Sequence, residues 1–383
     1  MDGRREAYQR ALPAVLDRVA GVLEATGLTF PYVYDRQRDT WETTDDGNWC
    51  GGHWIGLLWL AATHADDAAS ERFEAAARAH TETMRPAMPR DSMFCGMNFA
   101  YAGFRGYDHS GDRALFGLGL EGADAMVEAF DEDARQIPLG KLAIKGPEQF
   151  RGPESDHGPP GDRIGAVDNL YTAVAPLWRA YDEVGDTRFR DVAVSHADRH
   201  LDWYLRDDGR TWHHAVFDES GRLERQYNEL AYSDETCWAR GQGWSIAGLA
   251  AAYAATGASR YLDGLEANVE YYLAHTPDDL VPHWDFEVPD PETEPRDTSA
   301  AALAAYGLVA RLPADNSTTE LRSVGHDILD SLVDGYLVTE PGAQAHGRVE
   351  HGCFNRPGEY ATDTELVWTT YYLAETLASV LAG

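Results

Sequence analysis

The chain has 383 residues, of which 44% are hydrophobic, so it can bury a large core. Its formal net charge of -32 argues against nucleic acid or an anionic membrane as a partner, because phosphate groups are recognised by positive charge. No stretch approaches ~18 consecutive apolar residues, and the first residues, MDGRREAYQRALPAV, lack a signal peptide's apolar run. We therefore expect a soluble, cytoplasmic protein.

The acidic excess has a particular composition. Lys141 and Lys145 are the only lysines, so Arg supplies nearly all the positive charge, and the acids are spread along the whole chain. In dilute salt such a surface repels itself, whereas at molar salt the Debye length falls to ~3 Å and the repulsion largely vanishes. This pattern is typical of the cytoplasm of an extreme halophile; the alternative is an ordinary acidic protein.

The cysteines are far apart in the sequence and form no C-x-x-C pair. They are Cys50, Cys95, Cys237 and Cys353. Neither a disulfide framework nor a zinc site is expected from this spacing, and we predict four buried thiols.

Apolar residues recur with a period near 3.6 along almost the whole chain, and alternating strand patterns are rare. The pattern predicts twelve helices, at residues 5–26, 52–66, 69–84, 95–108, 112–130, 167–184, 187–206, 237–256, 259–275, 297–311, 319–336 and 364–381. No low-complexity linker divides them, so we expect residues 1–383 to form a single domain.

Several connections between these helices are short and share a signature. The segments YDHSGDRALF, YDEVGDTRFR and YAATGASRYL place Gly111, Gly185 and Gly257 where one helix stops, before an Asp or a small residue that can cap the next. The other connections are long, at residues 27–51, 85–94, 131–166, 207–236, 276–296 and 337–363. Long and short loops alternate, as in a ring of antiparallel hairpins, so all the long loops should gather on one face.

The helices that follow the long loops are the more apolar set, as in WIGLLWLAATHA, WSIAGLAAAYAA and TSAAALAAYGLVA. We expect these six to form an inner ring. Their N-termini would point to the long-loop face, where free N–H groups and the helix macrodipole favour anions. The predicted fold is all-α, an (α/α)6 barrel of six helical hairpins with an anion-friendly mouth.

Six segments at or before the starts of the inner helices hold the candidate functional residues. They are GNWCGGHW (47–54), RDSMFCGMNF (90–99), RIGAVDNLY (163–171), SDETCWARGQGW (233–244), PHWDFEVPDPETEPRDTSA (282–300) and ATDTELVW (361–368). Aromatic residues, carboxylates and amides are enriched in all of them. Indole rings stack on sugar rings and polar groups fix hydroxyls, so this set is typical of a sugar pocket.

These segments resemble the unsaturated glucuronyl hydrolases of glycoside hydrolase family 88, which have the (α/α)6 fold. The resemblance runs from about Trp49 to the end and is carried by GAVDNLY, SDETCWARGQGW, PHWDF followed by RDTSAAALAAYGL, and HGCF followed by VWTTYYLAETL. It implies an enzyme that removes the 4,5-unsaturated uronic acid from the non-reducing end of lyase-generated oligosaccharides. The double bond is hydrated and the glycosidic link then collapses through a hemiketal, with no metal or cofactor needed.

The resemblance also assigns roles to single residues. Asp168 matches the general acid/base that protonates C4 and helps water add at C5, so burial should lift its pKa toward the working pH. By position alone, Asp168 could equally cap a helix. Arg240 and Gln242 match substrate-contacting positions, and Arg240 would pair with the sugar carboxylate or shape the pocket by binding Asp168 or Asp234.

The other candidate substrate-binding residues lie in the same segments or in the family-like TWHHAVFD stretch. They are Trp238, Trp244, Thr236, His213, His214, Asn98, Trp49, Asp234 and Trp368. Core packing is the alternative role for the tryptophans, and a structural role is the alternative for the histidines. Asp285 and Asp297 also resemble family positions, and we expect Asp297 to be an N-cap.

One segment departs from the family pattern. The family usually carries H-D-x-G-F near the start of the fourth helix, and here CGMNFAY places Cys95 and Gly96 where the His and a catalysis-assisting Asp would stand. Asn98, Asp91 or Asp234 could replace that carboxylate; alternatively the substrate differs or activity is lost. Without the Asp, the pKa of Asp168 loses a like-charge neighbour that would have raised it.

Three other functions stay open. The barrel could act on unsaturated galacturonyl-rhamnose, as the related family 105 does, or it could be a uronate-oligosaccharide-binding homologue that has lost turnover. A sugar epimerase on the same toroidal fold would need a pair of His bases deep in the barrel, and the sequence offers no clear pair. The preferred polysaccharide and the oligomeric state are not set by the sequence.

Overall fold

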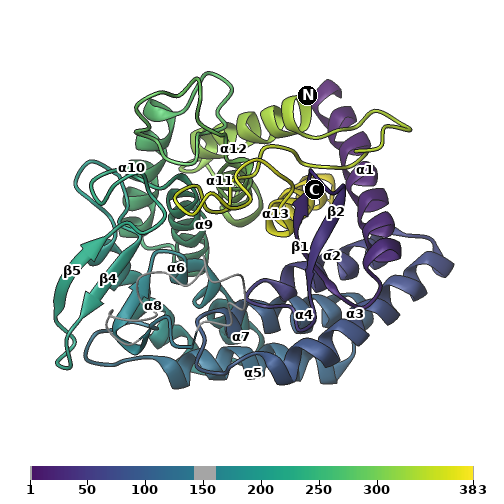
Figure 1. The fold of residues 1–383 in the computed structure, drawn as a ribbon. Coiled ribbons are helices and arrows are strands. Elements are labelled where there is room, and N and C mark those ends of the chain that lie inside the picture. The colour runs from purple at the N-terminus through teal and green to yellow at the C-terminus, as the bar shows by residue number, and fades with distance from the viewer. Residues whose placement is uncertain (1, 142–160, 383) are drawn as a thin grey trace.

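The computed structural model describes residues 2–141 and 161–382, and each of the twelve predicted segments is helical (Figure 1). The outer helices are α1 (Asp2–Thr26), α3 (Asp67–Ala87), α5 (Arg113–Ala129), α8 (Thr187–Trp203), α10 (Ser259–His275) and α12 (Thr319–Ser331). The inner helices are α2 (Gly51–His64), α4 (Phe94–Ser110), α6 (Asn169–Thr172) with α7 (Ala175–Val184), α9 (Ala239–Thr256), α11 (Thr298–Ala305) and α13 (Val367–Ala382). The π-helical turns η4 (Tyr306–Arg311) and η5 (Leu332–Tyr336) continue α11 and α12.

The inner helices close into a ring. Each contacts the next in order, from α2 through α4, α6 and α7, α9, α11 and α13 back to α2. Almost every residue of α2 and α9 is buried, whereas α3 and α8 bury one stripe each. A helix that is buried on all sides is what an inner wall requires. The predicted (α/α)6 barrel is confirmed; the one difference is that the helix predicted at 167–184 is divided between α6 and α7.

The short connections are built as the sequence predicts. Gly111, Gly185 and Gly257 have φ angles of 71°, 69° and 65°, the left-handed conformation in which glycine ends a helix without steric cost. The carboxylates of Asp112 and Asp186 then accept hydrogen bonds from the first backbone N–H groups of α5 and α8. These turns hold the outer helices antiparallel to the inner ones.

The long loops contain strands that the sequence did not predict. A hairpin joins β1 (Phe30–Asp35) to β2 (Thr40–Thr44), and an antiparallel sheet has the order β3-β4-β5, with β3 (Ile164–Ala166), β4 (His214–Phe217) and β5 (Leu223–Tyr227). A 3-10 turn, η3 (Gly161–Arg163), precedes β3. Because β1 and β4 are short and buried along almost their whole length, they show no alternation of apolar and polar residues.

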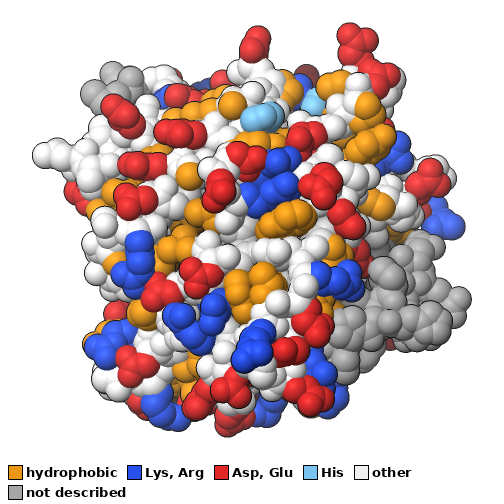
Figure 2. Space-filling model, turned by 90° about the vertical axis from the view of Figure 1, so that its left-hand side faces the viewer, with side chains coloured by type: hydrophobic (Ala, Val, Ile, Leu, Met, Phe, Trp, Pro, Cys, Tyr) orange, Lys and Arg blue, Asp and Glu red, His pale blue; other side chains and the backbone are white. Residues whose placement is uncertain are grey.

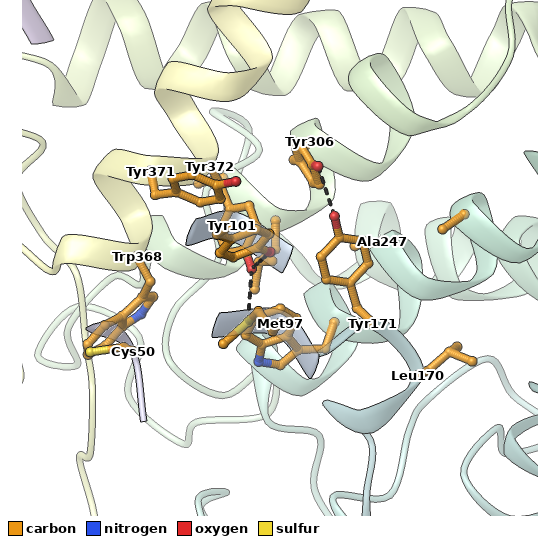
Figure 3. Packing of buried hydrophobic residues seen from close by; sticks show 14 of the residues in the cluster. Cys50, Met97, Tyr101, Leu170, Tyr171, Ala247, Tyr306, Trp368, Tyr371 and Tyr372 are labelled. Carbon is orange, nitrogen blue, oxygen red and sulfur yellow. Dashed lines mark hydrogen bonds between the residues drawn. The ribbon is translucent and has the colours of Figure 1, made fainter. Parts of the chain in front are cut away.

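Tyrosines of the inner helices and of η4 lie close together in the interior of the barrel (Figure 3). They are Tyr101, Tyr171, Tyr306, Tyr371 and Tyr372, all buried. The hydroxyl of Tyr171 donates to that of Tyr306 at 2.8 Å, and the hydroxyls of Tyr101 and Tyr372 lie 2.8 Å apart. These paired hydroxyls satisfy polar groups that burial would otherwise leave without partners. We call this cluster the tyrosine floor of the barrel interior.

The structure also bears on disulfides, membrane-spanning helices and metal sites. The cysteines Cys50, Cys95, Cys237 and Cys353 are buried free thiols, as predicted. In residues 2–141 and 161–382, no helix is both long and apolar enough to cross a bilayer. Within the same ranges, no three His, Cys, Asp or Glu side chains converge as a metal site would require.

Candidate active site

Asp168 lies directly before α6, at the mouth end of the inner ring. Its carboxylate makes no capping hydrogen bond, so the capping interpretation is wrong. Only 12% of the side chain is exposed, and within the described part of the chain Oδ2 has no hydrogen-bond partner. Burial raises the pKa of Asp168 to about 6, against the opposing charges of His214 and Arg240. A carboxyl group with this pKa can both donate and accept a proton near neutral pH.

The sheet β3-β4-β5 brings two histidines to Asp168. Val167 donates its N–H to the carbonyl of His213, which places the His213 Nε2 3.8 Å from the Asp168 Oδ2. The imidazole of His213 stacks on that of His214 with ring centroids 3.7 Å apart, and lies 4.4 Å from the ring of Trp238. Burial holds the pKa of His213 well below its ordinary value, so this ring is neutral. The residues GAVD and WHH, distant in sequence, thus form one site.

Arg240 shapes the mouth and binds neither Asp168 nor Asp234, which corrects one predicted role. Its guanidinium is buried and pairs with the carboxylate of Asp297 at 3.3 Å. It also donates to the hydroxyl of Ser299 and to the carbonyls of Cys353 and Phe354. Asp297 in turn caps α11 by accepting from the Ser299 N–H, as predicted. Arg240 therefore fastens α9 to α11 and to the loop at residues 351–356.

The four predicted tryptophans form a buried aromatic wall. Trp49 and Trp368 lie with ring centroids 4.9 Å apart, and both pack against Phe354. The Arg240 guanidinium lies 4.7 Å from the centre of the Trp238 ring, a cation–π contact. Trp244 stacks on Tyr171 in the floor. Each of these indoles is at most 6% exposed, so all four are packed into the interior.

The two amide side chains predicted to bind substrate form hydrogen bonds within the barrel. Gln242 is fully buried and donates to the carbonyls of Gly209 and Asn268, so it points away from Asp168 toward α10. Asn98 accepts from the N–H of Gly52 and donates to the carbonyls of Trp49 and Phe94. Asn98 therefore holds the start of α2 to α4, and the NH2 groups of both amides already donate to two backbone carbonyls each.

Asp285 stabilises the loop before α9 through hydrogen bonds. The buried carboxylate of Asp285 accepts from the Tyr232 N–H and from the hydroxyl of Thr236, at 2.9 and 2.8 Å. Burial raises the pKa of Asp285 to about 6. Asp234 is exposed and accepts from the Asn228 N–H. Thr236 and Asp234 thus shape this loop and do not face Asp168.

The second carboxylate of the family pattern has no counterpart on α4. A Cβ atom added at Gly96 would meet Met126 of α5 and Pro176 of α7, so position 96 faces these two helices in the barrel wall. Asp91 is exposed and pairs with Lys141 at 3.1 Å. The charges that act on the pKa of Asp168 come from His214 and Arg240. The expected replacement by Asn98, Asp91 or Asp234 is therefore not found.

Sequence reasoning missed Glu229, which does lie in this site. Its carboxylate Oε2 is 3.2 Å from the Nε2 of His214. The side chain is 22% exposed, in the loop that links β5 to α9. No local motif marks this acid, because only the pairing of β4 with β5 brings it to His214.

Together the barrel, the raised pKa of Asp168, and the imidazole and indole rings around it define a carbohydrate-active enzyme of the (α/α)6-barrel class. No family model matches the sequence. The chain is 28% identical over 385 residues to the unsaturated glucuronyl hydrolase of Bacillus sp. (strain GL1), covering 98% of this chain and 97% of that one. It is 27% identical to the unsaturated chondroitin disaccharide hydrolase of Streptococcus pneumoniae, covering 87% and 82%.

Solved structures agree with these relatives. The crystal structure of the Bacillus sp. GL1 unsaturated glucuronyl hydrolase matches with a TM-score of 0.85 at 26% identity, covering 97% of this chain and 96% of that one. The unsaturated glucuronyl hydrolase of Streptococcus agalactiae matches with a TM-score of 0.83 at 25% identity, covering 97% and 91%. The resemblance to the unsaturated glucuronyl hydrolases predicted from the sequence is confirmed.

Proposed function

We propose that this protein hydrolyses the 4,5-unsaturated uronic acid from the non-reducing end of lyase-generated oligosaccharides, with Asp168 as general acid/base. The main support for this proposal is the buried carboxyl group of Asp168 at the mouth of the barrel, whose pKa is about 6. The relatives of the chain are unsaturated glucuronyl hydrolases. A UGL variant at 26% identity and a TM-score of 0.84 is solved with dGlcA-Glc-Rha-Glc. An oligosaccharide of this kind is the substrate that we propose here.

The chemistry needs one carboxyl group that acts twice. Protonated Asp168 gives its proton to C4 of the vinyl ether, and positive charge develops at C5 and on the ring oxygen. Water then adds at C5 while the Asp168 carboxylate takes the released proton, which restores the acid. The hemiketal opens to a ketone at C5 and leaves a hemiacetal at C1, and this hemiacetal breaks down to an aldehyde and releases the second sugar with its hydroxyl group. An ordinary glycosidase, by contrast, places two carboxyl groups across the glycosidic bond.

His213 is suited to orient the reacting water or a sugar hydroxyl. Its ring is neutral, and its Nδ1 has no hydrogen-bond partner among the described residues. Because Nε2 faces Asp168, a neutral ring adds no positive charge that would hold Asp168 ionised. We propose that His213 positions substrate while Asp168 moves the protons.

The pKa of Asp168 predicts the pH dependence of turnover. The first step needs the protonated form, and that form is lost as pH rises through a pKa of about 6. We therefore expect kcat/KM for an unsaturated disaccharide to fall about tenfold per pH unit on the alkaline side. A profile measured at constant ionic strength checks this, and a rate still rising at pH 8 would contradict it.

A panel of lyase digests tests the function itself. Digests of ulvan, chondroitin, alginate and rhamnogalacturonan would be incubated with the protein in molar KCl, and loss of the ultraviolet absorbance of the double bond would be followed. We expect turnover of the glucuronyl products. Turnover confined to the rhamnogalacturonan product would favour the family 105 activity. Binding by titration calorimetry without loss of absorbance would favour the binding homologue.

We also propose that the protein is a single domain that works in the cytoplasm of a halophile. On the face shown in Figure 2, Asp and Glu side chains are spread among arginines, and the whole chain carries a net charge of -32. Salt screens this self-repulsion. We expect one cooperative thermal transition, with Tm rising by more than about 5 °C between dilute buffer and molar KCl. A Tm that does not change with salt would contradict the proposal.

A further inference from the structure

The imidazole of His214 lies between two oxygen acceptors. Strand pairing sets His214 opposite Ala166 on β3 and Tyr227 on β5, in the middle of the sheet. In this place its Nδ1 is 3.3 Å from the carbonyl of Gly165, and its Nε2 is 3.2 Å from the carboxylate of Glu229. A carbonyl oxygen can only accept a hydrogen bond, and an ionised carboxylate can only accept one. An imidazolium, which carries hydrogen on both ring nitrogens, satisfies both of these acceptors.

This geometry determines which of two stacked rings is charged. His213 and His214 are too close for both to hold a positive charge without strong repulsion. The Nε2 of His214 lies 3.2 Å from the carboxylate of Glu229, whereas the Nε2 of His213 lies 3.8 Å from the carboxyl group of Asp168, which must be protonated to act as the acid. The positive charge therefore belongs to His214, and His213 stays neutral beside Asp168.

Few other charged side chains of the described residues lie around these two histidines. Tyr227 on β5 stacks against His214 with ring centroids 4.9 Å apart, and the Arg225 guanidinium lies 4.6 Å from the centre of the Tyr227 ring. On the α9 side stands Arg240, whose charge is matched by Asp297. Among the described residues, the carboxyl group of Asp168 also interacts electrostatically with His214. Within residues 2–141 and 161–382, Glu229 faces His214 from the loop side.

We propose that Glu229 and His214 are a positioning pair that adjusts the protonation of Asp168. Glu229 holds His214 as an imidazolium, and this positive charge stabilises the Asp168 carboxylate that must accept the proton of water. The charge opposes the effect of burial, so Asp168 keeps access to both of its forms near neutral pH. The expected effect on the pH dependence of turnover rests on the proposed function, whereas the expected charge of His214 does not.

The charge of His214 is tested without substrate. The imidazole nitrogens of the histidines would be titrated by two-dimensional 15N NMR in the full chain at molar KCl. We expect His214 to show two protonated nitrogens at pH 7, and to lose one of them in Glu229→Gln at the same pH. A His214 ring that is neutral at pH 7 in the unmodified protein would overturn the proposal.

The effect on Asp168 is tested by the pH profile. In Glu229→Gln we expect the His214 ring to be neutral at pH 7, so Asp168 keeps its proton to higher pH. The alkaline limb of the kcat/KM profile should therefore move to higher pH by about one unit. His214→Asn should give the same shift, and the double variant no further shift. The control is Glu224→Gln, which removes one exposed acid of β5 and leaves the limb in place.

The outcomes separate the two proposals. If the alkaline limb of the kcat/KM profile does not move in Glu229→Gln, and the unmodified protein turns over normally, the proposed role of Glu229 and His214 is wrong. The proposed function is then unaffected. If the unmodified protein turns over no unsaturated substrate, the proposed function fails, and the NMR titration alone then decides the charge of His214.

Discussion

Replacing Asp168 by Asn is expected to lower kcat on an unsaturated disaccharide by about 10³-fold or more, because the amide can neither give a proton to C4 nor take one from water. The fold should survive. The carboxyl is largely buried and its Oδ2 has no hydrogen-bond partner among the described residues, so the substitution also removes an unfavourable desolvation cost. We therefore expect Tm to stay equal or to rise, as measured in molar KCl beside the absorbance assay.

A matched control for this variant is Asp182→Asn in α7. Asp182 is exposed at the opposite end of the inner ring and carries the same chemical change. It should keep full turnover. An Asp168→Asn protein that folds and retains more than about a tenth of the normal rate would remove the catalytic assignment.

Replacing Arg240 by Met should give the second large effect, on stability. The variant leaves the fully buried carboxylate of Asp297 without its cationic partner and removes the donors to the carbonyls of Cys353 and Phe354. Breaking a buried pair in this way costs about 3–5 kcal/mol. Chemical denaturation in molar KCl would measure the free energy of unfolding.

The comparison variant for Arg240 is Arg38→Met. Arg38 pairs with Asp35 at the surface, with 77% of its side chain exposed, and exposed pairs contribute about 0–1 kcal/mol. An Arg240→Met protein no less stable than Arg38→Met would mean that the guanidinium does not fasten α9 to α11. Asp168 does not contact Arg240 directly, so any loss of turnover in this variant should follow the loosening of the loop at 351–356.

The sequence by itself determined the helices, their order and the ring. Apolar residues at a period near 3.6 and glycines such as Gly111 and Gly185 act within a few neighbouring residues, so their effect can be read from the chain directly. The alternation of long and short loops then leaves one closed arrangement of hairpins. The motif around Asp168 also indicates the mouth from the sequence alone.

Only the tertiary structure decided which groups meet there. The short strand β4 carries no alternating signal, yet its pairing with β3 and β5 brings His213 to Asp168 and Glu229 to His214. Position 96 faces the barrel wall, which no spacing rule revealed. Long-range pairing and burial set these contacts and the pKa of Asp168. Both depend on residues that are distant in the chain, so a local pattern cannot contain them.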